Sequence, residues 1–393
     1  MSTLDGYDGY DGYDGYDGYD GYDGYEGSAP RGGRSSGHPG ALITHRDGIV
    51  GSWLPSGTAW ASGEIPRGVP GKLERWDPRV RRFVFESELL SSLYFAVDAA
   101  STGTQQWATL WSLDGVSADG STAPTGTWSK FISMTRPPET TLLKQLDLVN
   151  GYADLRADRA REIVAQMSPQ YAFWGSIVPL YPARHPRTLE LVGMVLRLAK
   201  YAEMNFKHAL CVRRPNEYSP QVQPMIQTPI HGSLPSGHST EAHAVARVLA
   251  KLVELKSTSI PPQLAAAILQ LRKLLMRQAA RIAINRTVAG VHYPVDSLAG
   301  QMLGLAVGQY FIARATGSGA SVDSWTFDGD AYPDDSTAKP GLGDFSGSEI
   351  YDVQNDALQQ TGGYLNPNAK ATITVDKAPC LTWLWVEAQK EWQ

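Results

Sequence analysis

The chain has 393 residues, of which 42% are hydrophobic, so it can bury a sizeable core and has room for two or three domains. Its 35 basic and 40 acidic side chains make it mildly acidic, which argues against a nucleic-acid-binding protein. Any attraction for an anion must therefore come from cations that gather at one place.

The N-terminal segment is a repeat of low complexity. Residues 5–25 are seven consecutive Asp-Gly-Tyr triplets, and a mixture rich in Gly, Ser, Pro and Arg continues to Gly40. A period of three matches neither a helical nor a strand stripe, and one negative charge in each triplet keeps the segment solvated. We predict a disordered tail over residues 1–40. Without a shaped loop, its aspartates would collect calcium only weakly.

Targeting and redox signals are sparse. The start of the sequence lacks the basic and apolar regions of a secretory signal, and no run of apolar residues is long enough to cross a bilayer. We expect a cytoplasmic protein that has no membrane partner. The two cysteines, Cys211 and Cys380, are too few for a disulfide scaffold and are interpreted as reduced thiols.

Residues 41–135 are rich in Trp, Gly, Ser and Pro. Apolar residues recur three and four apart near Glu86 to Ala100, which predicts a helix there. The rest of 41–135 is expected to be ordered coil, so that this region forms a loop-rich layer packed on the core.

Residues 136–317 carry the strongest helical periodicity, and proline or serine marks each helix start. We predict helices that start at Pro137, Pro186, Ser236, Pro261 and Pro294 and end near Gln166, Lys207, Leu255, Arg286 and Tyr310, respectively. The expected fold class is all-α, a helical bundle with loop-rich N- and C-terminal extensions. Residues 318–393 form the C-terminal extension, with one strand at Ala371 to Val375 and an apolar pair at Trp383 and Trp385.

Three short blocks carry the chemistry of the chain. They are KHALCVRRP from Lys207 to Pro215, PSGH from Pro235 to His238, and RTVAGVHYPVD from Arg286 to Asp296. Each block falls at a predicted helix end, and helix ends in a bundle can bring distant residues to one point. The blocks therefore predict a pocket for a tetrahedral oxyanion.

The residue types in the blocks fit that ligand. Lys207, Arg214 and Arg286 would oppose two or three negative charges, each pair worth about 4 kcal/mol at 4 Å before desolvation. The forked guanidinium groups can hold two oxygens at once. Ser236 and the Gly237 N–H would bind further oxygens at the start of a helix, where anions are favoured.

The two block histidines have different predicted roles. His292 lies close to Asp296, which could fix one ring nitrogen while the other attacks or coordinates the central atom. His238 is placed as an acid or base toward an apical oxygen. His243 lies further along the same helix and is interpreted as structural. No spacing typical of a zinc site occurs.

The three blocks resemble the signature shared by type 2 phosphatidic acid phosphatases, soluble bacterial acid phosphatases and vanadium-dependent haloperoxidases, all built on a helical core. The resemblance implies that Lys207, Arg214, Ser236, Gly237, His238, Arg286 and His292 bind vanadate, for which phosphate can substitute. It makes His292 the vanadium ligand or the phosphate nucleophile, and His238 the acid-base. One departure is Asn285, where the family usually has serine.

Within this family the length and the large N-terminal region favour a haloperoxidase. His231, seven residues before His238, resembles a histidine that bromoperoxidases carry near vanadate. The implied function is oxidation of a halide, with bromide favoured, by hydrogen peroxide, followed by halogenation of a small organic acceptor. Lys207, His231, His238, His292 and Asp296 are the expected catalytic residues, and a homo-oligomer is expected.

Three alternatives remain open. The chain could be a soluble acid phosphatase that acts through a phosphohistidine at His292, because phosphate and vanadate share shape and charge. It could also be an anion-binding scaffold that presents the tyrosine tail without turnover. The tail tyrosines are good acceptors for electrophilic bromine, so a haloperoxidase could halogenate itself.

Overall fold

The computed structural model describes residues 38–51, 72–98, 106–117, 125–254, 262–317, 320–333, 343–361 and 363–392. The Asp-Gly-Tyr repeat lies outside these residues, so its predicted disorder is not tested. The last three residues of the predicted tail begin a helix, α2 (His38–Ile49).

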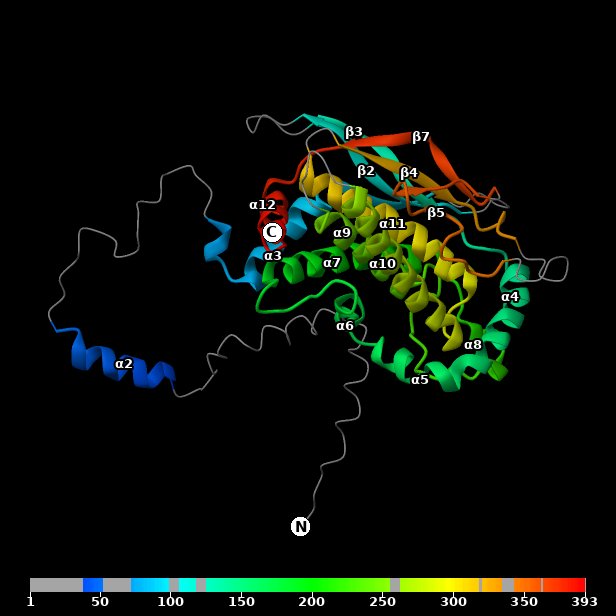
Figure 1. Cartoon of the computed structure of the whole chain (residues 1–393), viewed down its shortest axis with the longest axis horizontal. Helices are drawn as coiled ribbons and strands as arrows, with labels where there is room; N and C mark the ends of the chain where they lie inside the picture. Colours follow the sequence, from blue (N-terminus) through cyan, green and yellow to red (C-terminus); the bar gives the residue numbers. More distant parts are fainter. Residues whose placement is uncertain are drawn as a thin grey trace, which may run out of the picture.

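Four long helices form the centre of the molecule: α7 (Pro186–Leu210), α9 (Gly237–Leu252), α10 (Pro262–Val288) and α11 (Pro294–Thr316). Figure 1 shows them beneath a sheet. The predicted starts are confirmed: Pro186 and Pro294 occupy the first turns of α7 and α11, and Ser236 is the N-cap of α9. Proline suits a first turn, where its missing N–H has no helical partner.

Helices α9 and α11 pack closely because glycine recurs every fourth residue on one face of α11. A Cβ atom at Gly300 would lie 2.6 Å from the Ser236 carbonyl oxygen, and one at Gly304 would lie 2.3 Å from that of Thr240. Only glycine permits such an approach of two backbones. The contact brings the start of α9, with its PSGH block, next to the start of α11.

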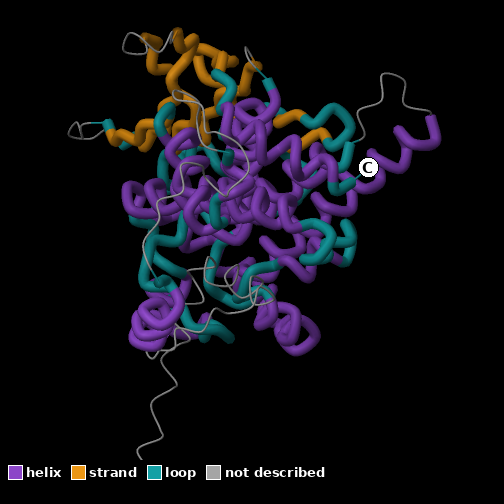
Figure 2. The backbone as a smooth tube through the Cα atoms, turned by 90° about the vertical axis from the view of Figure 1, so that its left-hand side faces the viewer, coloured by secondary structure: helices purple, strands orange, loops and turns teal. Residues whose placement is uncertain are grey.

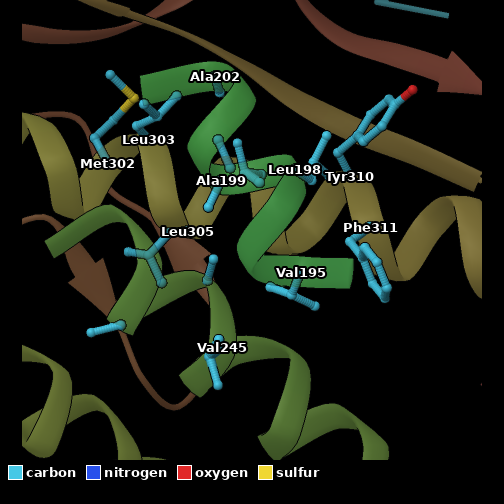
Figure 3. Close-up of a cluster of buried hydrophobic side chains, with 14 of the residues drawn as sticks. Val195, Leu198, Ala199, Ala202, Val245, Met302, Leu303, Leu305, Tyr310 and Phe311 are labelled. Carbon is cyan, nitrogen blue, oxygen red and sulfur yellow. The ribbon is translucent and has the colours of Figure 1, made fainter. Parts of the chain in front are cut away.

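The hydrophobic core lies between α7, α9 and α11, as Figure 3 shows. Val195, Leu198 and Ala199 of α7 meet Leu305 and Phe311 of α11, and all five side chains are buried. Each buried aliphatic side chain contributes roughly 1.5–3 kcal/mol. This core holds the helix ends that carry the three blocks in fixed positions.

Shorter helices cover one end of this core and precede it in the chain: α4 (Glu139–Tyr152), η4 (Ala153–Leu155), α5 (Arg156–Ala165) and α6 (Tyr171–Gly175). Two more lie between α7 and α9: α8 (Pro215–Tyr218) and η5 (Pro220–Val222). The helix predicted from Pro137 to Gln166 is therefore present but broken near Ala153.

The prediction for the N-terminal region was wrong in two respects. The helix expected over 86–100 is α3 (Pro78–Leu90), which follows η3 (Leu73–Arg75) and is capped by the Asp77 side chain on Arg79 N–H at 2.8 Å. Strand β1 (Leu93–Val97) follows it at once. The expected coil contains β2 (Ala108–Ser117) and β3 (Thr125–Met134).

A five-stranded mixed sheet corrects the all-α prediction. Its order is β1-β2-β3-β4-β7, where β4 spans Ala320–Phe327 and β7 spans Leu365–Val375. Strands β3 and β4 run parallel, with Ile132 opposite Trp325, and the other neighbours are antiparallel. The sheet forms one layer over the helices (Figures 1 and 2). It joins segments from both extensions, which no local pattern reveals.

The C-terminal extension ends in helix α12 (Pro379–Lys390), which contains both expected tryptophans. The strand predicted at Ala371 to Val375 is confirmed within the longer β7. Two short strands, β5 (Tyr351–Asp352) and β6 (Ala357–Leu358), pair with each other. The two cysteines are free thiols. No helix in the described part of the chain is both long and apolar enough to span a bilayer.

Candidate oxyanion site

Helix ends place the three cations of the blocks. Lys207 lies in the last turn of α7, Arg214 directly before α8, and Arg286 in the last turn of α10. All three side chains are buried, with exposed fractions of 2%, 2% and 1%. Buried cations are rare unless a partner or ligand compensates them, so their positions are informative.

Lys207 and Arg214 converge on one backbone carbonyl. The Gly232 oxygen accepts hydrogen bonds from Lys207 Nζ at 3.3 Å and from Arg214 Nη2 at 3.2 Å. Lys207 Nζ also donates to the Ser233 carbonyl at 3.2 Å. Burial, together with the Arg214 charge, lowers the pKa of Lys207 to about 7. An anion at this point would restore the charged form of the amine.

The tautomer of His292 is set by its two neighbours. Arg214 Nη1 lies 3.0 Å from His292 Nε2, and a guanidinium group can only donate, so Nε2 accepts. The ring proton is then on Nδ1, which lies 2.9 Å from Asp296 Oδ2. The lone pair of Nε2 therefore faces the cations.

Asp296 is a buried anchor for this imidazole. Its Oδ2 accepts from the Ser233 hydroxyl and from the Tyr293 N–H at 3.0 Å, in addition to His292. Burial raises the pKa of Asp296, while these hydrogen bonds act in the opposite direction. A carboxylate with several donors holds the ring in one orientation.

Arg286 and His238 meet on a second side of the site through Gln166, at the end of α5. Arg286 Nη2 donates to Gln166 Oε1 at 3.3 Å and to the Ile163 carbonyl at 3.1 Å. His238 Nε2 lies 2.9 Å from the Gln166 carbonyl oxygen and must donate to it. His238 therefore carries its proton on Nε2, toward Gln166.

All three site histidines are uncharged near neutral pH. Burial, followed by the charges of Arg214 and Lys207, lowers the pKa of His292 well below its usual range, and burial with Arg286 does the same for His238. The pKa of His231 falls to about 4 through burial, Lys207 and Arg214. The positive charge of the pocket therefore comes from lysine and arginine.

His231 belongs to the same cluster, since its Nδ1 lies 3.1 Å from Arg214 Nη2. His231, Gly232, Gly237 and His238 are each partly exposed, whereas the cations beneath them are buried. These four residues thus form the open side of the site. The structure brings together every site residue predicted from the sequence.

Ser236 has a local role as well. Its hydroxyl caps α9, and its N–H donates to the Asp296 carbonyl at 2.9 Å, which ties the PSGH block to α11. His243 is fully buried and its Nδ1 lies 2.8 Å from the Ser239 carbonyl, one turn back. The structural interpretation of His243 agrees with this geometry.

Three residues of the site were missed from the sequence: Gln166, Ser233 and Glu203. Gln166 comes from a helix with no motif, and Ser233 lies in a loop, so neither gave a signal. Glu203 is one turn before Lys207 on α7, and this spacing could have identified it. A Cβ atom at Gly237 would lie 2.7 Å from Glu203 Oε1, and Glu203 Oε2 is buried and has no hydrogen-bond partner among the described residues.

Burial and the nearby Glu241 raise the pKa of Glu203 to about 8. A neutral carboxylic acid beside a pocket for anions avoids charge repulsion and can donate a hydrogen bond. Among the described residues no group of three or more His, Cys, Asp or Glu side chains could hold a metal cation. The three buried cations, Lys207, Arg214 and Arg286, suit a tetrahedral oxyanion.

Residues 189–317 match the family model of the PAP2 superfamily, a span that contains all three blocks. A solved structure with similarity to the chain is the first transmembrane PAP2 type phosphatidylglycerolphosphate phosphatase from Bacillus subtilis. It is 20% identical, with a TM-score of 0.26, and the alignment covers 43% of this chain and 79% of that one. No curated protein matches the chain.

Proposed function

We propose that this chain, whose residues 189–317 form a PAP2 superfamily domain, is a vanadate-dependent haloperoxidase that oxidises bromide with hydrogen peroxide. The observation that carries the proposal is the buried imidazole of His292, held by Asp296, with its Nε2 lone pair directed into a cluster of cations. A neutral nitrogen ligand among fixed positive charges fits a metal oxyanion better than a bare metal cation.

The donor set fits vanadate. Lys207, Arg214 and Arg286 would hold its oxygens, and the Nε2 atom of His292 would ligate the vanadium. In the described residues, the hydrogen-bond partners of Lys207 Nζ are carbonyl oxygens, and a bound anion would stabilise its protonated form. Bound vanadate would supply Lewis-acid activation of hydrogen peroxide without a change of oxidation state.

Side chains of the protein would then stabilise the developing negative charge and transfer protons. Oxidation of bromide by peroxide yields hypobromous acid and water and consumes one proton. Lys207 and the guanidinium groups would stabilise negative charge on peroxide oxygens, and His238, a neutral imidazole at the open side of the site, would accept and pass on protons as a base. Small organic acceptors would meet the product outside the pocket.

His231 favours the haloperoxidase over other oxyanion chemistry. Its ring lies on Arg214 at the open side, where halide and peroxide would enter, and burial keeps it neutral. A neutral third imidazole adds a hydrogen-bonding group without attracting a second oxyanion. Bromide preference, a cytoplasmic location and homo-oligomeric assembly are further parts of this proposal.

A second candidate is a phosphomonoesterase that forms a phosphohistidine at His292, and the PAP2 match favours it. The same lone pair would attack phosphorus while the cations stabilise the transferring oxygens. His238 would protonate the leaving alkoxide. The pocket charges serve both reactions equally, so turnover must decide between them.

The test assays both reactions side by side, with and without added vanadate. We expect bromination of a phenol dye that requires peroxide, bromide and vanadate, that is lost in His292→Ala, and that persists in Arg277→Ala, a control outside the site. Release of phosphate from nitrophenyl phosphate that exceeds any bromination, and that vanadate inhibits, would replace the proposal by the phosphatase. Tight binding of vanadate or phosphate without bromination or phosphate release would contradict both enzymatic functions and support an anion-binding scaffold.

A further inference from the structure

A second basic cavity lies away from the oxyanion site. Its volume is about 550 Å³, and it is lined by α10, by Arg159 of α5 and by the segment from Gly347 to Val353. Lys273, Arg277 and Arg281 recur every four residues along α10 and so share one face of the helix. No residue of the oxyanion site lines this cavity.

The cations of this cavity are only partly compensated. Arg281 pairs with Glu162 through two hydrogen bonds of 2.8 and 2.7 Å, and Arg159 donates to the neutral Asn285 side chain at 3.0 Å. Within the described parts of the chain, neither Lys273 nor Arg277 forms an ion pair. The cavity therefore carries a net positive charge.

Apart from Gly347 and Ser348, the rest of the lining is apolar or aromatic: Met276, Ala280, Ile284, Tyr351 and Val353. The neighbouring Asp352 forms no ion pair with these cations within the described residues; its Oδ1 accepts from the Gln354 and Asn355 N–H groups at 2.8 and 3.2 Å. A ligand suited to this cavity combines negative charge with rings or apolar groups.

We propose that the Asp-Gly-Tyr repeat, residues 5–25 of the same chain, binds in this cavity. The seven aspartates of the repeat contribute seven negative charges, whereas the net charge of the whole chain is −5. The rest of the chain is therefore net positive. Each triplet pairs one carboxylate with one phenol ring. The carboxylates would meet Lys273 and Arg277, and the rings would pack on Met276, Ile284 and Tyr351.

The spacing of charges is compatible with this arrangement. Lys273 and Arg277 lie four residues apart on α10, which corresponds to about 6 Å. Aspartates one triplet apart lie at most about 10 Å apart, in a fully extended chain, so a bent triplet can present two carboxylates to the two cations. Residues 26–71 separate the repeat from Lys72. Helix α2 spans part of this linker at about 1.5 Å per residue, and each of its other residues can span up to about 3.3 Å, so the linker is long enough to bring the repeat to a distant surface.

Tethering makes weak contacts sufficient. An exposed ion pair contributes at most about 1 kcal/mol, so a free copy of one triplet would bind poorly. A segment of the same chain is present at an effective concentration on the order of millimolar. Because the seven triplets are equivalent, any one of them can occupy the cavity, which favours the bound state statistically.

Zero-length cross-linking of the full chain tests the proposal. Carbodiimide joins a carboxylate to a lysine amine in direct contact, and the repeat has no lysine or arginine before Arg31, so trypsin releases it as one peptide. We expect cross-links from this peptide to Lys273 that exceed those to Lys377 and Lys390 by at least about fivefold and that fall with added salt.

Variants separate specific binding from general attraction. Arg277→Glu should reduce the Lys273 cross-link at least about threefold, whereas Lys377→Glu, an exposed cation outside the cavity, should leave it unchanged. Replacing the seven repeat tyrosines by serine keeps every carboxylate and should also reduce it. Equal cross-linking to all three lysines, or insensitivity to Arg277→Glu, would overturn the proposal.

Isotope labelling identifies the source of the repeat. In a mixture of ¹⁴N and ¹⁵N chains, binding within one chain gives cross-linked peptides of uniform label. Mixed-label products at the statistical frequency would show that a second copy supplies the segment, and would contradict binding in the same chain.

Discussion

At the scale of residues, the site consists of neutral histidine side chains that lie among buried lysine and arginine side chains. Arg214 donates toward His292 Nε2 while Asp296 receives the Nδ1 proton, so the ring keeps one tautomer and one orientation. The residue types and block positions were predictable from the sequence. The partners Gln166 and Ser233 were not, since they reach the site through tertiary packing.

Gly237 gives the first prediction, because its Cα atom lies against the Glu203 carboxyl group. Gly237→Ala would place a Cβ atom 2.7 Å from Glu203 Oε1, which forces either that carboxyl or the start of α9 to shift. We expect oxyanion affinity to fall by about tenfold or more, as measured by titration calorimetry. The double variant Gly237→Ala/Glu203→Ala should regain most of the lost oxyanion affinity. A double variant that binds the anion as weakly as Gly237→Ala would contradict a steric conflict between residue 237 and Glu203.

The pH dependence of anion binding follows from Lys207 and Glu203. The pKa of Lys207 is lowered to about 7 and that of Glu203 raised to about 8, so rising pH removes a positive charge and adds a negative one. Both changes weaken anion binding. Tungstate, whose charge is constant over this range, should bind about tenfold less tightly at about pH 9 than at about pH 6.

Lys207→Met provides the control for this titration. The variant should bind tungstate more weakly at about pH 6 and show a smaller change with pH, because one titrating group is gone. Affinity that increases with pH would contradict the assigned directions.

At the scale of elements, the C-terminal segment caps the helix that carries Lys207. Glu391 accepts from the Arg187 and Thr188 N–H groups at 2.7 and 2.8 Å, and no side chain of α7's own N-cap residue does so. Trp392 covers this helix start, since its ring stacks on His185 at 4.3 Å. The capping contact spans some 200 residues and has no sequence signature.

Glu391→Ala should therefore lower the free energy of unfolding by about 1–2 kcal/mol through the loss of the cap. The measurement is urea denaturation. Glu387→Ala, which removes a partly exposed carboxylate paired with Lys390, is the matched control and should change stability by less than about 0.5 kcal/mol. Equal effects of the two substitutions would show that the cap does not stabilise α7.

The helix starts were predictable from the sequence, whereas among the strands only the segment Ala371 to Val375 of β7 was. Proline at the first turn and serine at the N-cap fixed the starts of α7, α9 and α11, because these signals are local. Strand β3 pairs in parallel with β4, so Ile132 lies opposite Trp325, about half the chain length away in sequence. Pairing over such a distance depends on the packed core rather than on nearby residues, and the all-α prediction failed for that reason.

At the scale of the whole molecule, the sheet joins both extensions into one layer over the core. Asp114 of β2 accepts from the Thr374 N–H of β7 at 2.9 Å and pairs with Lys370. Phe131 of β3 packs on Tyr310 of α11, with ring centroids 5.6 Å apart. These contacts tie the helices of residues 136–317 to strands from both extensions.

Calorimetry can check this coupling. The full chain should unfold in a single cooperative transition, and a fragment of residues 136–317 should lack one, since it exposes the face of α11 that the sheet covers. Two separate transitions in the full chain, or a fragment that melts cooperatively at the same temperature, would contradict the joint fold.

The central claim is that Lys207, Arg214, Arg286 and His292 bind a single tetrahedral oxyanion. Equilibrium titration with vanadate tests it most directly, on the full chain and on Arg214→Met, Arg286→Met and Arg277→Met. We predict one vanadate per chain, a loss of affinity of about tenfold or more in the first two variants, and no change in Arg277→Met. Absence of binding, or equal affinity in all four proteins, would contradict the account.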